Sequence, residues 1–145
     1  MKEGVCEMAL HNSSSAARMN EESTGNGYKD SYKSPVDVSP RNFYIEPGNK
    51  SLDELCEEMG EGYVITDVSG LHAGIDFITT NFSLLCEGYY VKDGKRDYSV
   101  NLVTVAGNFL ELMKNVEDVG NDIEWKFGGI ACPSIYFKEC AISGE

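Results

Sequence analysis

The pattern of apolar and polar residues in the middle of the chain predicts a long β-hairpin. Residues 84–91 form a mostly apolar run that is followed by Asp93-Gly94. An Asp-Gly pair between β-prone flanks favours a type I′ turn, in which both central residues need a positive φ. We therefore expect a returning strand over residues 96–106, with residues alternating between its two faces: Tyr98, Val100, Leu102 and Thr104 on one, and Ser99, Asn101 and Val103 on the other.

Two segments have the spacing of amphipathic helices. The first covers residues 52–59, where Ser51 and Glu54 form a capping box and Gly60 is placed to end the helix. The second covers residues 109–116. Their apolar positions recur at helical spacing: Leu52, Leu55, Cys56 and Met59 in the first, and Phe109, Leu110, Met113 and Val116 in the second. Asn108 is the expected N-cap of the second helix, and Met113 is expected in the core.

The remaining β-prone runs are short. We expect strands over residues 42–45, 62–68, 124–127 and 134–142. Together with the hairpin and the helices, this order predicts an α+β fold. The expected domain is a β-rich sheet with a long central hairpin and two or three short helices segregated on one side.

The first 40 residues have little pattern. A short helix could form within residues 1–10, but Ser, Asn, Gly and Pro then dominate, and these residues favour turns and loops. A loop of about 40 residues is atypical of a compact domain. Segment 1–40 is therefore expected to be a functional loop, a disordered tail or a truncated piece.

Composition excludes some classes of partner and compartment. The chain of 145 residues has 24 acidic and 12 basic residues, and its net charge of −12 argues against nucleic acid or an anionic membrane as the main partner. The N-terminus lacks the apolar run of a signal peptide, and no stretch approaches the length of a membrane span. Five cysteines at irregular spacing, without a C-x-x-C, indicate a reduced, cytosolic setting.

Few residues predict chemistry by their spacing. The two histidines, His11 and His72, do not belong to a metal-binding helix motif, and the chain has no G-x-S-x-G, P-loop or dinucleotide fingerprint. A nucleophile pair of His72 with Cys132 or Cys86 stays open as an alternative. Asp122 is most simply a turn residue. Spacing and composition therefore predict a soluble α+β domain without a recognisable active site.

The most distinctive stretch is the segment 70–83, which we call the glycine-histidine box. Gly70 and Gly74 flank His72, and a polar segment leads into Phe82 and Ser83. Glycines in this arrangement are more often turn residues than ligand contacts, and a single imidazole makes no site without partners.

A series of motifs, in order, resembles the C-terminal part of the TldD/PmbA family, also called modulators of DNA gyrase. Thr80 departs from the family pattern, which usually has Gly there. The motifs run along nearly the whole chain: Ser23-Thr24-Gly25-Asn26-Gly27-Tyr28 with Ser34-Pro35, Asn42 to Gly48, Val68 to Gly74 with Thr79 to Ser83, Glu87-Gly88, Asp93-Gly94, Val105 to Phe109, Val119-Gly120-Asn121-Asp122 and Cys132-Pro133-Ser134.

The resemblance implies one domain over residues 1–145, with 1–40 as its loop-rich part and the family's N-terminal domain absent. TldD-like members of the family bind zinc with an HExxxH helix and a C-terminal cysteine. This chain has no HExxxH, and residues 119–122 stand about where that cysteine would be. The resemblance therefore implies a TldE/PmbA-like subunit without catalytic or metal-binding residues of its own, so that zinc would belong to a TldD-like partner.

The same resemblance implies partners and a site. The expected partners are a TldD-like subunit and a peptide substrate, in a hetero- or homodimer, with no direct role for nucleic acid or membrane. Such a cytosolic complex cleaves small or unfolded peptides and is linked to peptide-antibiotic maturation and antitoxin turnover. The alternative is a non-enzymatic fragment or interaction domain. The expected peptide-binding or motif residues are Gly70, His72, Gly74, Thr79, Phe82 and Ser83.

Overall fold

The computed structural model of the chain describes residues 7–126 and 128–144. They divide into two compact units. Unit 1 comprises Met1–Tyr44 and Trp125–Ala131, and unit 2 comprises Ile45–Glu124 and Cys132–Glu145. The helix expected within residues 1–10 lies partly outside the described residues, and residues 7–10 are not helical.

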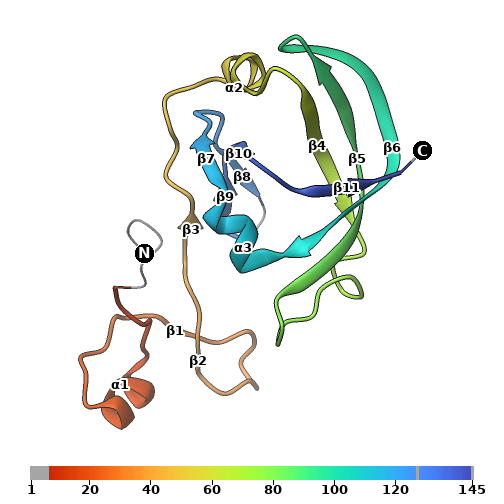
Figure 1. Cartoon of the computed structure of the whole chain (residues 1–145). Helices are drawn as coiled ribbons and strands as arrows, with labels where there is room; N and C mark the ends of the chain where they lie inside the picture. Colours follow the sequence, from red (N-terminus) through yellow and green to blue (C-terminus); the bar gives the residue numbers. More distant parts are fainter. Residues whose placement is uncertain (1–6, 127, 145) are drawn as a thin grey trace. The chain divides into compact units, whose positions relative to one another are not determined.

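Unit 1 is built from short elements. Helix α1 (Ser13–Met19) is followed by the antiparallel pair β1 (Gly27–Tyr28) and β2 (Asp37–Val38). Strand β3 (Phe43–Tyr44) pairs in parallel with β9 (Ile130–Cys132), and the three-stranded sheet has the order β3-β9-β8, with β8 at Glu124–Lys126 (Figure 1). Strand β9 was not predicted.

Helix α1 corrects the prediction of a loop around residues 11–15. Asn12 is the N-cap: its side chain accepts from the Ser15 amide at 2.8 Å, and Ser15 Oγ accepts from the Asn12 amide at 3.0 Å. The helix ends at Asn20, which has a φ of +56°. Asn and Ser favour caps as well as loops, so a polar run that reads as a loop also forms a capping box.

Unit 2 contains the predicted hairpin. Strands β5 (Asn81–Lys92) and β6 (Lys95–Asn108) are antiparallel, and the turn residues Asp93 and Gly94 have φ values of +50° and +74°, as a type I′ turn requires. The four-stranded sheet has the order β11-β6-β5-β4, with β4 at Gly62–Ser69 and β11 at Ala141–Ser143 (Figure 1). The hairpin prediction is confirmed, and so is the α+β fold class.

Two bulges flank the same point of β5. In β4, the register with β5 shifts around Thr66, opposite Glu87-Gly88. In β6, the register shifts between Val100 and Val103, where Leu102 has a φ of +59°. The bulge breaks the alternation predicted for residues 96–106: Leu102 is 67% exposed and Val103 is buried.

Helix α2 (Leu52–Met59) agrees with its prediction. The Ser51–Glu54 capping box is present, Leu55 and Cys56 are buried, and Gly60 is the C-cap with a φ of +70°. The side chain of Cys56 contacts Tyr89 of β5. The helix therefore covers one face of the sheet near the β5–β6 turn (Figure 1).

The C-terminal elements differ from their predictions. Helix α3 (Phe109–Lys114) has Asn108 as its N-cap, as expected, but none of its residues is buried, so Met113 is not core. Val116 instead begins β7 (Val116–Val119), which pairs with β10 (Ile135–Phe137). The single strand expected over residues 134–142 is two strands, β10 and β11, in different sheets. The chain crosses between them at residues 138–140, where the Lys138 amide donates to Asn115 O at 2.9 Å.

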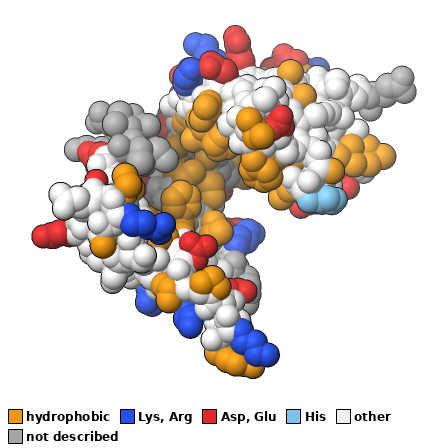
Figure 2. Space-filling view, turned by 90° about the horizontal axis from the view of Figure 1, so that it is seen from below, with side chains coloured by type: hydrophobic (Ala, Val, Ile, Leu, Met, Phe, Trp, Pro, Cys, Tyr) orange, Lys and Arg blue, Asp and Glu red, His pale blue; other side chains and the backbone are white. Residues whose placement is uncertain are grey.

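The described residues bury few large side chains. Fully or nearly fully buried hydrophobic residues include Leu55, Cys86, Val91 and Val103, whereas many large apolar side chains are exposed and mixed with charged ones (Figure 2). None of the helices among the described residues is long and apolar enough to cross a membrane.

Candidate functional site

The glycine-histidine box is a closed loop between β4 and β5. Gly70 has a φ of +81°, and its carbonyl accepts from the Gly74 amide at 2.8 Å. The Gly74 carbonyl accepts from the Ser83 amide at 2.8 Å, and a Cβ atom at Gly74 would overlap the Ser83 carbonyl oxygen. The two glycines and Ser83 therefore form the base of the loop through their backbones.

The outer part of the box is exposed. Asp76 Oδ1 accepts from the amides of Ile78 at 2.8 Å and Thr79 at 3.2 Å, and these bonds lower the pKa of Asp76. Phe77 is 82% exposed and Ile78 is 94% exposed, and His72 is also exposed. The box therefore presents an imidazole and two large apolar side chains to the surroundings.

Asn108 joins the box to α3. Its amide group donates to Thr79 O and to Asn81 Oδ1, each at 2.9 Å, and its side-chain oxygen accepts from the first-turn amides of α3. The Phe109 amide donates to Thr80 O at 2.8 Å. Phe82 extends toward the same region, since its ring lies 3.4 Å from where a Cβ of Gly107 would be. The box and the Ala106-Gly107-Asn108 motif are thus one structure.

Thr80, which stands where the family pattern usually has glycine, has a left-handed backbone conformation. Its φ is +60°, which is unfavourable for a β-branched residue. We expect Thr80→Gly to stabilise the chain by about 1 kcal/mol, because release of this strain exceeds the entropy that a glycine adds to the unfolded state. Urea unfolding measures the change.

The matched control is Thr79→Gly. Thr79 has no positive φ, and its Oγ1 accepts from the Asn81 amide at 3.4 Å. We expect this variant to be less stable than the parent chain. Equal effects of the two glycines would contradict the assignment of strain to Thr80.

A second network joins three motifs that are far apart in the sequence. Asp122 accepts from the Ser134 amide at 2.9 Å and from Ser134 Oγ at 2.7 Å. The Gly120 amide donates to Ser134 O at 2.7 Å, and the Gly48 amide donates to Gly120 O at 2.9 Å. The backbone N–H of Asn121 donates to the Lys50 carbonyl oxygen at 2.8 Å. The Pro47-Gly48, 119–122 and 132–134 motifs thus form one hydrogen-bonded cluster, which we call the aspartate cluster.

An ion pair lies beside the aspartate cluster. Lys50 Nζ is 2.6 Å from Asp118 Oδ2 and also pairs with Glu58. The hydrogen bond from Lys50 lowers the pKa of Asp118, and hydrogen bonds to Asp118 and Glu58 raise the pKa of Lys50. These side chains are partly exposed, so the pairs contribute little net stability.

The carboxylates of these networks predict a loss of stability in acid. Partial burial opposes ionisation of Asp122, but the hydrogen bonds from Ser134 outweigh it, so its pKa is lowered. A lowered folded-state pKa gives stability that is present above the unfolded-state value and is lost as the pH falls through the folded value. We expect the free energy of unfolding to fall below about pH 4. The free energy of unfolding of the Asp122→Asn variant should fall less steeply in this pH range. Urea unfolding at a series of pH values measures the difference, and identical pH profiles of the variant and the parent chain would contradict the prediction.

The surroundings of Cys86 and Cys132 disfavour the thiolate form. Burial raises the pKa of Cys86, and partial burial together with Asp122 raises that of Cys132. Cys132 Sγ donates to the Pro133 carbonyl at 3.2 Å. Nucleophilic cysteines need a lowered pKa, so these surroundings do not support a nucleophile. Both carboxylate oxygens of Asp122 accept hydrogen bonds from Ser134.

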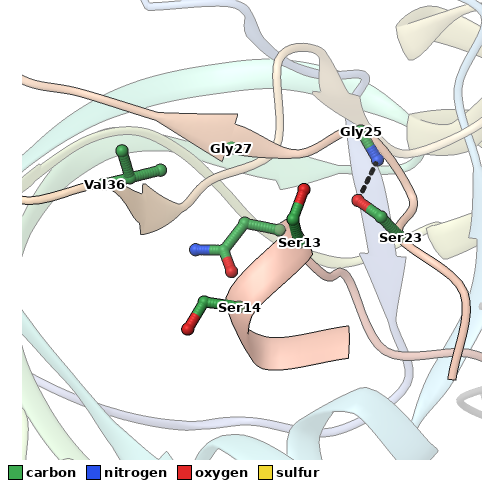
Figure 3. Close-up of a pocket in the computed structure, with 7 residues that line it drawn as sticks. Ser13, Ser14, Ser23, Gly25, Gly27 and Val36 are labelled. Carbon is green, nitrogen blue, oxygen red and sulfur yellow. Dashed lines mark hydrogen bonds between the residues drawn. The ribbon is translucent and has the colours of Figure 1, made fainter. Parts of the chain in front are cut away.

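Unit 1 has its own hollow, of about 450 Å³. Ser23 and Gly25 of the Ser23-Thr24-Gly25-Asn26 motif line it, and the Gly25 amide donates to Ser23 Oγ at 3.3 Å (Figure 3). Its other lining residues are Asn12, Ser13, Ser14, Gly27 and Val36. None of these lining residues is titratable, so the hollow offers hydroxyl and amide groups but no general acid or base.

His11 is buried and makes several polar contacts within unit 1. Its Nδ1 lies 3.2 Å from Ser15 Oγ, and its Nε2 lies 3.1 Å from Glu21 Oε2. Thr24 Oγ1 bonds both backbone groups of His11. The contacts resemble a Ser-His-Glu relay, but Ser15 Oγ is already part of the α1 cap and does not line the hollow. We therefore interpret His11 as a structural link.

Charge is distributed unevenly between the units. Unit 2 holds 18 of the 24 acidic residues but 6 of the 12 basic ones, and unit 1 holds the other six of each. The whole net charge of −12 therefore belongs to unit 2. Any charged partner of this unit is expected to be cationic.

The motif residues thus form two hydrogen-bonded networks, the links of Asn108 to the glycine-histidine box and the aspartate cluster. Each network connects loops that are far apart in the sequence. The structure brings Gly70, Gly74 and Ser83 into contact and places Thr79 and Phe82 against the Asn108 region, while His72 is exposed. Sequence reasoning did not predict the links through Asn108, Asp122 or His11. For Asn108, the sequence indicated only that it is the N-cap of the helix beginning at Phe109.

The family follows from comparison with known proteins. The model of the PmbA/TldA metallopeptidase C-terminal domain matches residues 1–144. Metalloprotease PmbA of Escherichia coli O157:H7 is 31% identical over 145 residues, which are 100% of this chain and 29% of that protein. A metalloprotease TldD homolog of Buchnera aphidicola is 28% identical, over 99% of this chain and 32% of that protein. The chain belongs to the PmbA/TldD family of metallopeptidases.

Solved structures agree in fold. A protein of Thermotoga maritima described as a modulator of a DNA gyrase superposes with a TM-score of 0.86 and 36% identity, over 97% of this chain and 31% of that one. TldE from Thermococcus kodakarensis superposes with a TM-score of 0.74 and 25% identity, over 89% of this chain and 29% of that one. The chain thus spans about a third or less of these relatives.

Proposed function

We propose that this chain acts as a TldE/PmbA-like part of a cytosolic metallopeptidase complex, in which a TldD-like partner holds zinc and cuts small or unfolded peptides. The observation that carries the proposal is the aspartate cluster. At residues 119–122, where TldD-like members would have a ligand cysteine, the chain has Asp122 bonded through both oxygens to Ser134. This segment supports a structural role.

The exposed surface supports a role that depends on partners. Phe77 and Ile78 at the outer part of the glycine-histidine box, and Phe109 and Leu110 of α3, are large apolar side chains that the described residues leave uncovered. Exposed apolar side chains in such number are typical of association surfaces. In this proposal, the box with His72 contacts the partner or its peptide, and β4, the terminal strand of its sheet, offers an edge to an extended peptide.

The test is co-purification of the 145-residue chain with a TldD-like subunit, followed by a peptide-cleavage assay with and without a zinc chelator. We expect a stable complex in gel filtration and faster, chelator-sensitive cleavage than with the partner alone. A double variant that carries Phe77→Ser and Ile78→Ser should form a weaker complex. Lack of a complex and of any gain in cleavage would reject the proposal and leave the interpretation as a non-enzymatic fragment.

A further inference from the structure

Three tyrosine rings form a ladder across the sheet of unit 2. Tyr63 of β4 is directly paired with Tyr90 of β5, and their ring centroids are 5.2 Å apart. Tyr98 of β6 stacks on Tyr90 with centroids 5.1 Å apart and an interplanar angle of 29°. The outer rings are accessible, because Tyr63 is 37% and Tyr98 51% exposed.

The ladder lies on the face of the sheet away from α2. Neighbouring residues of a strand point to opposite faces. Tyr89 and Val91, on either side of Tyr90, belong to the covered face: Val91 is completely buried, and Tyr89 contacts Cys56 of α2. On the ladder face, Tyr63 and Tyr98 are exposed and Tyr90 is half-buried.

Negative charge borders the ladder. The hydroxyl of Tyr90 donates to Glu61, which raises the pKa of Tyr90 to about 12. The register of β6 with β5 shifts between Tyr89 and Val91, so Asp97 and Tyr98 both lie opposite Tyr90 in this bulge, and Asp97 acts on Tyr98 electrostatically. The ladder also belongs to the unit that carries the whole net charge of the chain. Aromatic faces next to carboxylates are favourable positions for a cation.

The same hairpin already shows this type of contact on its other face. The guanidinium carbon of Arg96 lies 4.6 Å from the centroid of the Tyr89 ring. Another cation–π contact joins Lys33 and Tyr32 in unit 1. The ladder therefore combines negative neighbours with exposed rings, and within the part of the chain that the structure describes no cation is recorded over these rings.

We propose that the ladder of Tyr63, Tyr90 and Tyr98 binds an arginine side chain of a cationic peptide segment. The guanidinium stacks on the exposed rings, and Glu61 or Asp97 accepts its N–H groups. Arginine fits better than lysine, because its planar group can stack and hydrogen-bond at the same time. This inference requires neither zinc nor peptide cleavage, so it is independent of the proposed function.

The experiment is an NMR titration of the full chain with the peptide acetyl-Gly-Arg-Gly-Arg-Gly-amide. The same peptide with citrulline, which keeps the shape but has no charge, is the ligand control, and the lysine peptide is a second comparison. We expect the arginine peptide to shift signals of residues 63, 90 and 98, the lysine peptide to bind more weakly, and the citrulline peptide to give no shift.

Variants distinguish binding to the tyrosine rings from attraction by the overall negative charge of the chain. Tyr98→Leu should weaken binding roughly fivefold, whereas Tyr98→Phe, which keeps the ring, should bind like the parent chain. Tyr32→Leu removes an exposed tyrosine of unit 1 and should have no effect. Unchanged affinity of Tyr98→Leu, or shifts centred on Glu57 and Glu58 of α2, would overturn the inference. If Tyr98→Leu does not fold, the shift map and the citrulline comparison on the parent chain decide.

Discussion

Gly88→Ala is expected to lower the free energy of unfolding by about 3 kcal/mol, the upper part of the range for overpacking. A Cβ atom at Gly88 would overlap the Val64 carbonyl oxygen and lie 3.0 Å from Ile65 Cα. These are backbone atoms of β4, so relief requires the strand itself to move. Urea unfolding, followed by circular dichroism, measures the loss.

The control for this prediction is Gly107→Ala in β6 of the same hairpin. A Cβ atom there would lie 3.4 Å and 3.6 Å from ring atoms of Phe82, which is ordinary contact. We expect a change below about 1 kcal/mol. If both variants had similar stability, the close approach of β4 to Gly88 would not be the reason for the glycine.

Gly48→Ala is expected to have an effect of similar size, about 3 kcal/mol, through the aspartate cluster. A Cβ atom at Gly48 would overlap the Val119 carbonyl oxygen and lie 2.9 Å from its carbon. The Gly48 amide would then lose its bond to Gly120 O, and the Asn121 amide its bond to Lys50 O. Denaturant unfolding gives the global loss, and faster hydrogen exchange of the Asn121 amide reports the local one.

Gly27→Ala is the comparison in unit 1. Its Cβ atom would lie 3.5 Å from Asn12 Cβ and from Val36 Cγ1, without overlap. It should leave both stability and the exchange of the Asn121 amide nearly unchanged. A stable Gly48→Ala variant with a protected Asn121 amide would show that the cluster does not depend on this glycine.

Local chemistry explains why the hairpin and α2 could be predicted. The turn at Asp93-Gly94 and the capping box at Ser51 and Glu54 each involve residues at most three apart. Their geometry follows from backbone preferences that operate before any tertiary contact forms. The helix boundary at Gly60 has the same origin.

The wrong predictions concern segments whose structure is determined by long-range packing. The positive φ of Leu102 moves the side chains around it to other faces, and this bulge depends on the pairing with β5. The split of the predicted strand 134–142 likewise follows from two different partners, β7 and β6. A hydrophobic spacing cannot tell which sheet a residue joins.

Prediction of the candidate site from the sequence was limited for the same reason. The family resemblance identified motif segments, but the sequence could not indicate that Asn121 bonds the Asn49 carbonyl, 72 residues away, or that Asp122 is satisfied by Ser134. Residue type suggested chemistry at His72 and Cys132, whereas the surroundings of Cys132 raise the pKa of its thiol. The spatial partners of a residue, which the sequence does not give, determine its chemistry.

The uneven charge of the two units means that salt should act on them differently. In dilute buffer, repulsion among the 18 carboxylates of unit 2 opposes its compact form, whereas unit 1 has balanced charges. Raising the ionic strength from 0.01 M to 0.15 M shortens the screening length from about 30 Å to about 8 Å. Amide exchange should therefore slow with added sodium chloride in β4, β5 and β6 and change little in α1, so that the medium tunes the rigidity of one unit while leaving the other as it was.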